Sequence, residues 1–445
     1  MGDGRLEKME VDYSSSVDEL LPKVKELAEA GNIDSALEQC VSLEKQTRMA
    51  SDAISTGRLL EAMVEILADA CQWEKLNQHL EVMTKKRNQL KQAVTKMVQK
   101  ALTYLDKTPD EETKLGLIGS LRRVTEGKIY VEVERARLTK ELARIKEVNG
   151  QVDEAASVLQ ELQVETFGSM EKREKVEFML EQIRLGLAKK DYIRTQIISK
   201  KISPKFFADG AHEELKLKYY RLMIELDLHE NHYLNVSRHY WEVYSSKSIQ
   251  EDEGKRLLAL KHVVAYLVLA PYDNEQHDLM CRRKILKDME NIPAYLDILK
   301  AFTTQEIVRW EEFQKRHREV LRTETDVFSG EKSPELAEKH WNDLHSRIVE
   351  HNIRVIAGYY TMIRLSRMAQ LLDLDLEKAE KYLSDLVVSK TVVAKIDRLE
   401  GVVHFIETKT PIEILNDWSH NADCLMTLIN QATHLINKER MIHAM

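Results

Sequence analysis

Hydrophobic and polar positions in the first half of the chain repeat with a period of about forty residues. Each copy of the pattern has an apolar or aromatic anchor at the start of a predicted helix: Ile33, Trp73, Val152, Tyr192 and Tyr233. The anchors are 40, 79, 40 and 41 residues apart, so the interval of 79 holds two periods with a weak copy near Thr113. A period of this length is typical of solenoids of helix–turn–helix pairs, in which each pair buries its apolar face against its neighbours.

The residues around each anchor favour a helix, a short turn and a second helix. Three residues after the anchor, on the same helical face, stand small or apolar partners: Ala36, Leu76, Ala155, Thr195 and Val236. Two residues before the anchor stand Gly31, Cys71, Gly150, Lys190 and Asn231. Glycine and asparagine, at three of these five positions, tolerate the left-handed conformation that ends many helices. We expect a flexible polar tail over residues 1–16, a first helix that opens near Val17, and a helical-repeat arm over 17–244.

The middle of the chain is predicted to hold further helical repeats over residues 245–335. A polar stretch at 245–255 predicts a longer loop between helices. Turn-forming and charged residues gather at 323–334, which is the strongest candidate for a boundary in the chain. We therefore expect a different kind of domain to follow this segment.

The pattern beyond that boundary predicts a winged helix over residues 336–408. Apolar positions that include Leu344 and Ile356 predict one long helix, and a shorter helix is expected at 368–372. A third helix is expected at 376–388. Two runs of β-branched residues, 392–396 and 402–406, then predict a β-hairpin. Three helices and a hairpin are the elements of a winged helix.

The last predicted helix, residues 411–445, shows a different apolar spacing. Its apolar residues follow intervals of 3, 4, 3, 4, 3 and 4, with Leu428 and Leu435 widening the seam on one side: Leu415, Trp418, Ala422, Leu425, Ile429, Ala432 and Ile436. This is the a and d pattern of helices that pack in bundles. The pattern predicts an assembly helix that joins partner helices, and the alternative that it folds back on its own winged helix remains open.

The composition is typical of a helical protein and shows no excess of positive charge. Only 7 prolines and 15 glycines occur among 445 residues, and 31% of residues are charged. The formal net charge of −8 does not favour nucleic acid or anionic lipid. The third winged-helix helix is itself slightly acidic, with three acidic and two basic residues: Glu377, Glu380, Asp385, Lys378 and Lys381. Binding to a DNA duplex is therefore disfavoured.

The sequence lacks the signatures of catalysis. Gly116, Gly119 and Gly127 with Lys128 do not have the spacing of a phosphate-binding loop. No HExxH pair occurs for zinc, and we expect no metal site, no cofactor and no enzymatic activity. The four cysteines lie far apart, as in a reducing compartment, and neither a leader nor a membrane span is apparent. A cytoplasmic and nuclear location is expected.

Helical repeats followed by a winged helix resemble the PCI-domain family, and four segments resemble the PCI subunits of the proteasome lid in particular. They are VTEGKIYVEVERARLTK (124–140), LQVETFGSMEKREKVEFMLEQIRL (162–185), HSRIVEHNIRVIAGYYTMI (345–363) and EILNDWSHNADCLM (413–426). The resemblance implies a non-catalytic scaffold in a hetero-oligomer that serves degradation of ubiquitinated proteins. A PCI scaffold of the signalosome, or of a translation initiation factor with RNA binding, is the alternative.

The resemblance also implies partners and surfaces. Its partners would be other lid PCI subunits, the lid deubiquitinase pair, the base ATPases and the core particle, with no nucleic acid and no membrane. In that family winged helices line up through their sheet edges and C-terminal helices form one bundle. The heptad seam would supply the bundle helix, and the hairpin would supply a sheet edge through Val392, Ala394, Ile396, Val402, Val403 and Phe405.

Overall fold

The computed structural model describes residues 12–207, 210, 212–330, 334–405 and 411–443. Contacts within the chain divide it into two compact units, Met1–Leu226 (unit 1) and Asp227–Met445 (unit 2). The predicted fold class is confirmed: stacked helix pairs, a winged helix with a small sheet, and a long C-terminal helix. The finer domain ranges given above stay a prediction.

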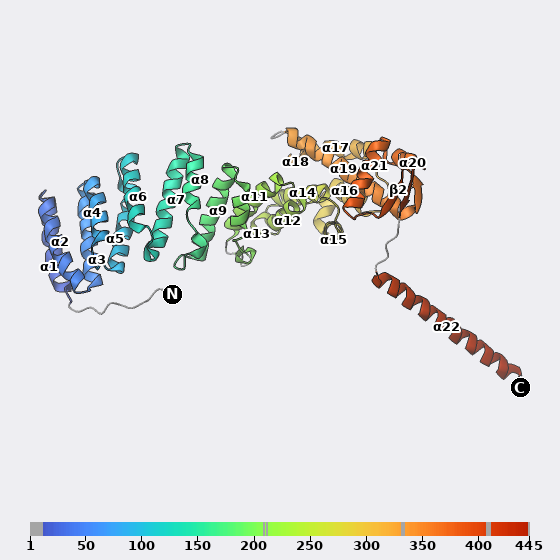
Figure 1. Ribbon diagram of the computed structural model, residues 1–445, viewed down its shortest axis with the longest axis horizontal. Coiled ribbons are helices and arrows are strands. Elements are labelled where there is room, and N and C mark those ends of the chain that lie inside the picture. Colours follow the sequence, from blue (N-terminus) through green and yellow to red (C-terminus); the bar gives the residue numbers. More distant parts are fainter. Residues whose placement is uncertain (1–11, 208–209, 211, 331–333, 406–410, 444–445) are drawn as a thin grey trace. The chain divides into compact units, whose positions relative to one another are not determined.

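Unit 1 is a row of helix pairs, drawn from blue to green in Figure 1. Its α-helices are α1 (Ser14–Glu29), α2 (Ile33–Met49), α3 (Ala53–Asp69), α4 (Trp73–Lys85), α5 (Lys91–Thr103), α6 (Glu111–Thr125), α7 (Glu132–Val148), α8 (Val152–Gln160), α9 (Lys172–Ala188), α10 (Tyr192–Ser199) and α11 (Glu213–His229), which crosses into unit 2. Its 3₁₀ helices are η1 (Leu105–Lys107), η2 (Ile129–Val131), η3 (Val164–Thr166) and η4 (Pro204–Phe207). The first helix thus begins three residues before the predicted Val17.

Every predicted anchor is the first residue of a helix, namely of α2, α4, α8, α10 and α12 (Tyr233–Tyr244). All five residues that stand two positions earlier have positive φ: Gly31 (86°), Cys71 (55°), Gly150 (80°), Lys190 (64°) and Asn231 (59°). A backbone hydrogen bond closes the turn: the N–H group after the left-handed residue donates to the carbonyl five residues earlier. In the first turn Asn32 N–H donates to the Leu27 carbonyl at 3.0 Å. The same bond occurs at each of the other four turns, where its donors are Gln72, Gln151, Asp191 and His232.

The weak repeat near Thr113 is built differently. Thr113 lies in the first turn of α6, and the link from α5 runs through η1 and Pro109. Asp110, the residue before α6, has an extended conformation with φ of −124°. Because a proline fixes φ near −65° and removes an N–H, this link cannot reproduce the left-handed turn of the other copies.

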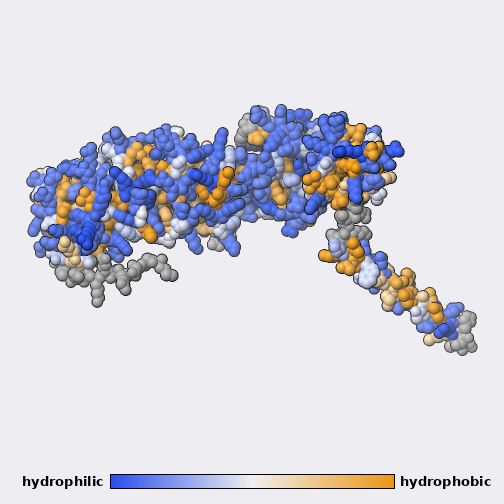
Figure 2. All heavy atoms as spheres, viewed as in Figure 1, coloured by the Kyte–Doolittle hydropathy of each residue, from blue (hydrophilic) through white to orange (hydrophobic). Residues whose placement is uncertain are grey.

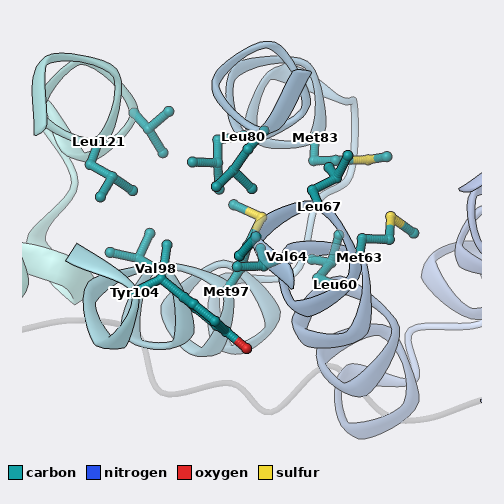
Figure 3. Close-up of a cluster of buried hydrophobic side chains, with 14 of the residues drawn as sticks. Leu60, Met63, Val64, Leu67, Leu80, Met83, Met97, Val98, Tyr104 and Leu121 are labelled. Atoms are coloured by element: carbon teal, nitrogen blue, oxygen red, sulfur yellow. The ribbon is translucent and has the colours of Figure 1, made fainter. Parts of the chain in front are cut away.

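The core of unit 1 is shared between consecutive pairs. The four partner residues that follow the anchors of unit 1, Ala36, Leu76, Ala155 and Thr195, are at most 1% exposed, and so is Val236 in unit 2. Figure 3 shows how side chains from α3, α4, α5 and α6 meet between the helices, among them Leu67, Leu80, Met97 and Leu121. Each pair therefore depends on its neighbour to cover its apolar face, as a solenoid requires.

Ion pairs also link one repeat to the next. Arg58 reaches Asp18 at 2.6 Å, and Lys75 reaches Asp34 at 2.8 Å, over sequence separations of 40 and 41 residues. Farther along unit 1, the Arg184 guanidinium bonds both oxygens of Glu147. These hydrogen bonds hold the pKa of Glu147 below its ordinary value, although burial opposes the shift.

Unit 2 continues with helices and ends in the winged helix. Its α-helices are α12 (Tyr233–Tyr244), α13 (Lys247–Gln250), α14 (Glu253–Leu269), α15 (Asn274–Lys284), α16 (Pro293–Thr303), α17 (Trp310–Glu324), α18 (Asp326–Ser329), α19 (Pro334–Tyr359), α20 (Leu365–Leu372), α21 (Leu376–Val388) and α22 (Pro411–His443), with η5 at Lys287–Asn291. Its strands are β1 (Met362–Arg364), β2 (Ala394–Asp397) and β3 (Val402–Phe405). The winged-helix core is formed by α19, α20, α21 and the sheet.

Two segments expected to be loops contain short helices. The predicted loop at 245–255 includes α13, and α14 already begins at Glu253. The boundary segment 323–334 includes α18, whose Val327 and Phe328 are buried. Val327 and Phe328 explain why a helix forms in the segment 323–334, because their burial holds an otherwise polar, turn-forming segment against the core.

The sheet contains a strand that the sequence did not predict. The order is β1-β3-β2, and both neighbours of β3 are antiparallel to it. The hairpin of β2 and β3 is confirmed, although Ile406, the end of the predicted second run, lies outside the described residues. Because β1 pairs with one side of β3, β3 is the central strand, and β2 and β1 form the two edges of the sheet. Of the two hairpin strands β2 is therefore the edge strand, and its pairing with another chain stays a prediction.

Candidate assembly surfaces

The six hairpin residues predicted at the interface occupy three different settings. Val392 is buried before β2, and Ala394 and Ile396 lie on β2, the edge strand. The remaining three lie on the central strand, where Val403 is fully buried: Val402, Val403 and Phe405. The structure therefore places five of the six residues in one sheet and Val392 just before it, and of the six only Ala394 and Ile396 lie on an edge strand.

Hydrogen bonds fix which way the backbone of each strand points. Phe405 N–H donates to the Thr361 carbonyl at 2.8 Å, so the backbone of Phe405 faces β1. Successive residues of a strand turn their backbone groups to opposite sides, and His404 therefore faces β2. His404 is the register partner of Lys395, whose N–H and carbonyl consequently point inward to β3.

The same alternation leaves Ala394 and Ile396 with outward-facing backbone groups. These are the N–H and C=O groups that a strand from another chain would bond. Side chains on the same strand restrict promiscuous pairing, because Lys395 and Asp397 are exposed and charged. The free edge of β2 (Ala394–Asp397) is therefore a short site for strand addition at which charged side chains disfavour non-specific pairing.

The seam of α22 is exposed along its length, as Figure 2 shows by the apolar side chains spread over this helix. Exposure runs from 48% to 71% for the large seam residues Leu415, Trp418, Leu425, Leu428, Ile429 and Ile436, and Ala422 and Ala432 are exposed too. Exposed apolar side chains gathered on one helix are typical of surfaces that mediate association, and the interface role of these residues stays a prediction. We call these eight residues the α22 seam.

One group of side chains in the described part of the chain has the spacing of metal ligands. Ligand atoms of Asp227, Glu230 and His232 lie within 4.8 Å of one another at the turn between α11 and α12. The Asp227 carboxylate is already 2.8 Å from Nε2 of His239 on α12. This contact gives Asp227 a structural part in holding the turn.

The described helices include none with the length and apolar character that crossing a membrane demands.

Comparison with known proteins divides the chain in the same order as its elements. Residues 35–252 match the family described as PSMD12/CSN4, N-terminal, and residues 314–407 match the PCI domain. Residues 413–444 match the 26S proteasome regulatory subunit RPN5 C-terminal domain, and 413–443 of them fall on α22. The chain is 42% identical to the 26S proteasome regulatory subunit RPN5 of Saccharomyces cerevisiae, over 98% of both chains.

The chain belongs to the family of 26S proteasome regulatory subunit RPN5, also named non-ATPase regulatory subunit 12. It is 39% identical to the non-ATPase regulatory subunit 12 of Dictyostelium discoideum, over 98% of this chain and 96% of the relative. Identity to COP9 signalosome complex subunit 4 of Drosophila melanogaster is lower, 26% over 75% of this chain and 78% of the relative. The predicted membership in the PCI-domain family is thus confirmed.

Proposed function

We propose that this chain is a non-catalytic scaffold subunit in the lid of the 26S proteasome regulatory particle. The observation that carries the proposal is the full-length similarity to regulatory subunits of that particle. The chain contributes two adhesive surfaces, the free edge of β2 and the α22 seam. Enzymatic steps in the degradation of ubiquitinated proteins belong to other subunits.

The two surfaces suit one partner class, other PCI subunits of the lid. A neighbouring strand would bond the outward backbone groups of Ala394 and Ile396, and neighbouring helices would cover the α22 seam. Two separate weak contacts on one chain strengthen each other through effective concentration. The helical-repeat arm would then contact the other partners, namely the deubiquitinase pair, the base ATPases and the core particle.

Charges around the winged helix favour a protein partner over nucleic acid. On α21, Lys378 pairs with Asp375 at 3.2 Å, and Glu380 accepts from Arg398 at 2.6 Å. These pairs offset the charges of Lys378 and Arg398, two of the basic side chains that would otherwise meet phosphate groups. We infer that the winged helix serves assembly and does not read a duplex.

The α22 seam is tested with Leu425→Asp and Ile429→Asp in one chain. In a bundle core two carboxylates without partners would be strongly unfavourable, so incorporation into a lid reconstituted from its subunits should fail. The melting temperature of the isolated chain should stay unchanged. The matched control is Thr427→Asp with Gln431→Asp, which adds the same charges four residues apart on the opposite face.

Normal incorporation of the seam variant would contradict the proposal. A lower melting temperature of the isolated seam variant, with the control unaffected, would show that α22 packs within its own chain. Turnover of a nucleotide or an isopeptide by the purified chain would contradict the non-catalytic part.

A further inference from the structure

A hollow of about 620 Å³ opens in unit 2 where the winged helix meets the preceding helices. Its walls come from α16, from the last turns of α19 and from the end of the sheet where β2 begins. Cationic or titratable side chains lie on one side, namely Arg354, His351 and His277. Apolar and aromatic residues, including Tyr359, Tyr360, Val392, Val393 and Phe405, line the hollow together with polar residues: Thr303, Thr304, Gln305, Thr361 and Thr391.

Arg354 has hydrogen-bond donors that nothing in the described part of the chain accepts. Its Nε and Nη1 atoms are buried without a partner. The guanidinium carbon lies 3.5 Å from the centre of the Tyr272 ring, which offsets part of the cost of burying the charge. Burial lowers the pKa of Arg354 to about 10, so the side chain stays charged at neutral pH. A buried charged donor left unpaired is costly and marks a place where a ligand can contribute.

No acidic side chain among the described residues accepts a hydrogen bond from Nε or Nη1 of Arg354, although Glu350 attracts its charge. Glu350 lies one turn earlier on α19, but its Oε2 already accepts from Arg347 at 2.8 Å. His351 has its Nε2 3.2 Å from the Glu306 carbonyl and does not supply a negative charge. The charges that face the hollow are therefore predominantly positive or neutral.

We propose that this hollow binds an acidic side chain from an extended segment of a partner protein. The guanidinium of Arg354 is a planar fork, and its end-on pair of donors on Nη1, which lacks a partner, and Nη2 matches the two oxygens of a carboxylate. The apolar rim, including Tyr360 and Val393, would receive the residues that flank the acid. Residues 391–393 line the hollow and lead directly into β2, so a strand added to the free edge of β2 would run toward Arg354.

This inference rests on the proposed function only for the statement that the ligand is a protein. Its test uses the isolated full-length chain, so failure here leaves the α22 seam experiment untouched. The probe is a fluorescein-labelled capped peptide with one glutamate between two leucines, followed by fluorescence anisotropy. A second probe carries glutamine in place of glutamate.

The decisive variant is Arg354→Met, with Arg364→Met as the matched control. Arg364 is an exposed arginine of β1 that does not line the hollow, and both changes remove one positive charge. We expect saturable binding to the unchanged chain and to the control, and at least about tenfold weaker binding to Arg354→Met and of the glutamine peptide. The melting temperature of Arg354→Met should not fall, because an unpaired buried charge is removed.

The proposal is overturned by any of three results. One is absence of saturable binding up to about 1 mM peptide, the weak end of specific affinity. Another is equal binding by the Arg354→Met and Arg364→Met variants. The third is displacement of the peptide by inorganic phosphate at a lower concentration than by unlabelled peptide, which assigns the hollow to phosphate. If Arg354→Met unfolds, Arg354→Lys, which keeps the charge but loses the parallel donors, should bind more weakly than Arg364→Lys.

Discussion

Lys190 has a left-handed backbone conformation, with φ of 64°, although it carries a side chain. Cys71 has the same conformation, and neither lysine nor cysteine is a residue type from which a left-handed conformation would be predicted. What identifies both positions is their distance of two residues before an anchor of the repeat. The turn is imposed by the packing of the helix pair, and glycine or asparagine only makes it less costly.

Replacing Lys190 by glycine should therefore stabilise unit 1. Glycine relieves the strain that the Cβ atom causes in the left-handed conformation, and this effect outweighs the larger conformational entropy of the unfolded chain. We expect the free energy of unfolding to rise by about 0.5–1 kcal/mol. The matched control is Lys189→Gly, because Lys189 has φ of −77° and should lose stability by a similar amount. Urea denaturation measures both. A loss of stability in Lys190→Gly would contradict the expectation.

A second residue-scale prediction concerns His351, which is buried on α19. Burial, assisted by the nearby charge of Arg354, lowers its pKa to about 4. The unfolded chain, with a histidine pKa of about 6.5, binds more protons between those values. The contribution of neutral His351 to stability is thus fully present above about pH 6.5 and is lost as the pH falls toward about 4.

Urea denaturation at pH 7 and at pH 5 should show this loss, which for His351 alone amounts to at most about 3 kcal/mol over the whole range. His351→Gln should make the stability less dependent on pH, and His404→Gln, at an exposed position of β3, should not. An unchanged pH dependence in His351→Gln would contradict the assignment.

At the scale of elements, the long helices were predictable, whereas the short helices α13 and α18 were missed and the sheet was predicted only in part. The sequence predicted α21 with both of its ends, because its apolar spacing is regular and Asp375 and Ser389 flank it. It missed β1, where only Ile363 of three residues is buried. Such a strand has too short an alternation to stand out, and it forms because β3 offers it a partner. The hollow around Arg354 was also out of reach, since its walls are far apart in the sequence.

Proline substitutions on β2 test whether its outward-facing backbone N–H groups, and not its side chains, bind a neighbouring strand. Ala394→Pro removes an outward N–H, so the isolated chain should keep its melting temperature while incorporation into the reconstituted lid decreases. Lys395→Pro, one residue away, removes an inward N–H bonded to β3 and should destabilise the winged helix by roughly 1–3 kcal/mol. Equal melting temperatures of the two variants would contradict the assigned strand direction.

At the scale of the whole molecule, the chain combines a self-supporting fold with surfaces that its own described residues leave open. The repeats are covered by their neighbours, whereas the α22 seam is exposed throughout. Sequence spacing alone located this seam, because a heptad pattern depends on one helix and not on the rest of the fold. The central claim is that this seam fixes the chain in its assembly.

Competition between the full chain and a chain without residues 411–445 tests that claim most directly. Equal amounts of both are mixed with the remaining lid subunits, and the chains in the purified assembly are quantified by mass spectrometry. We predict that the truncated chain melts as the full chain does but is at least about a hundredfold under-represented, because one of two linked contacts is lost. Equal incorporation of the two chains would contradict the account.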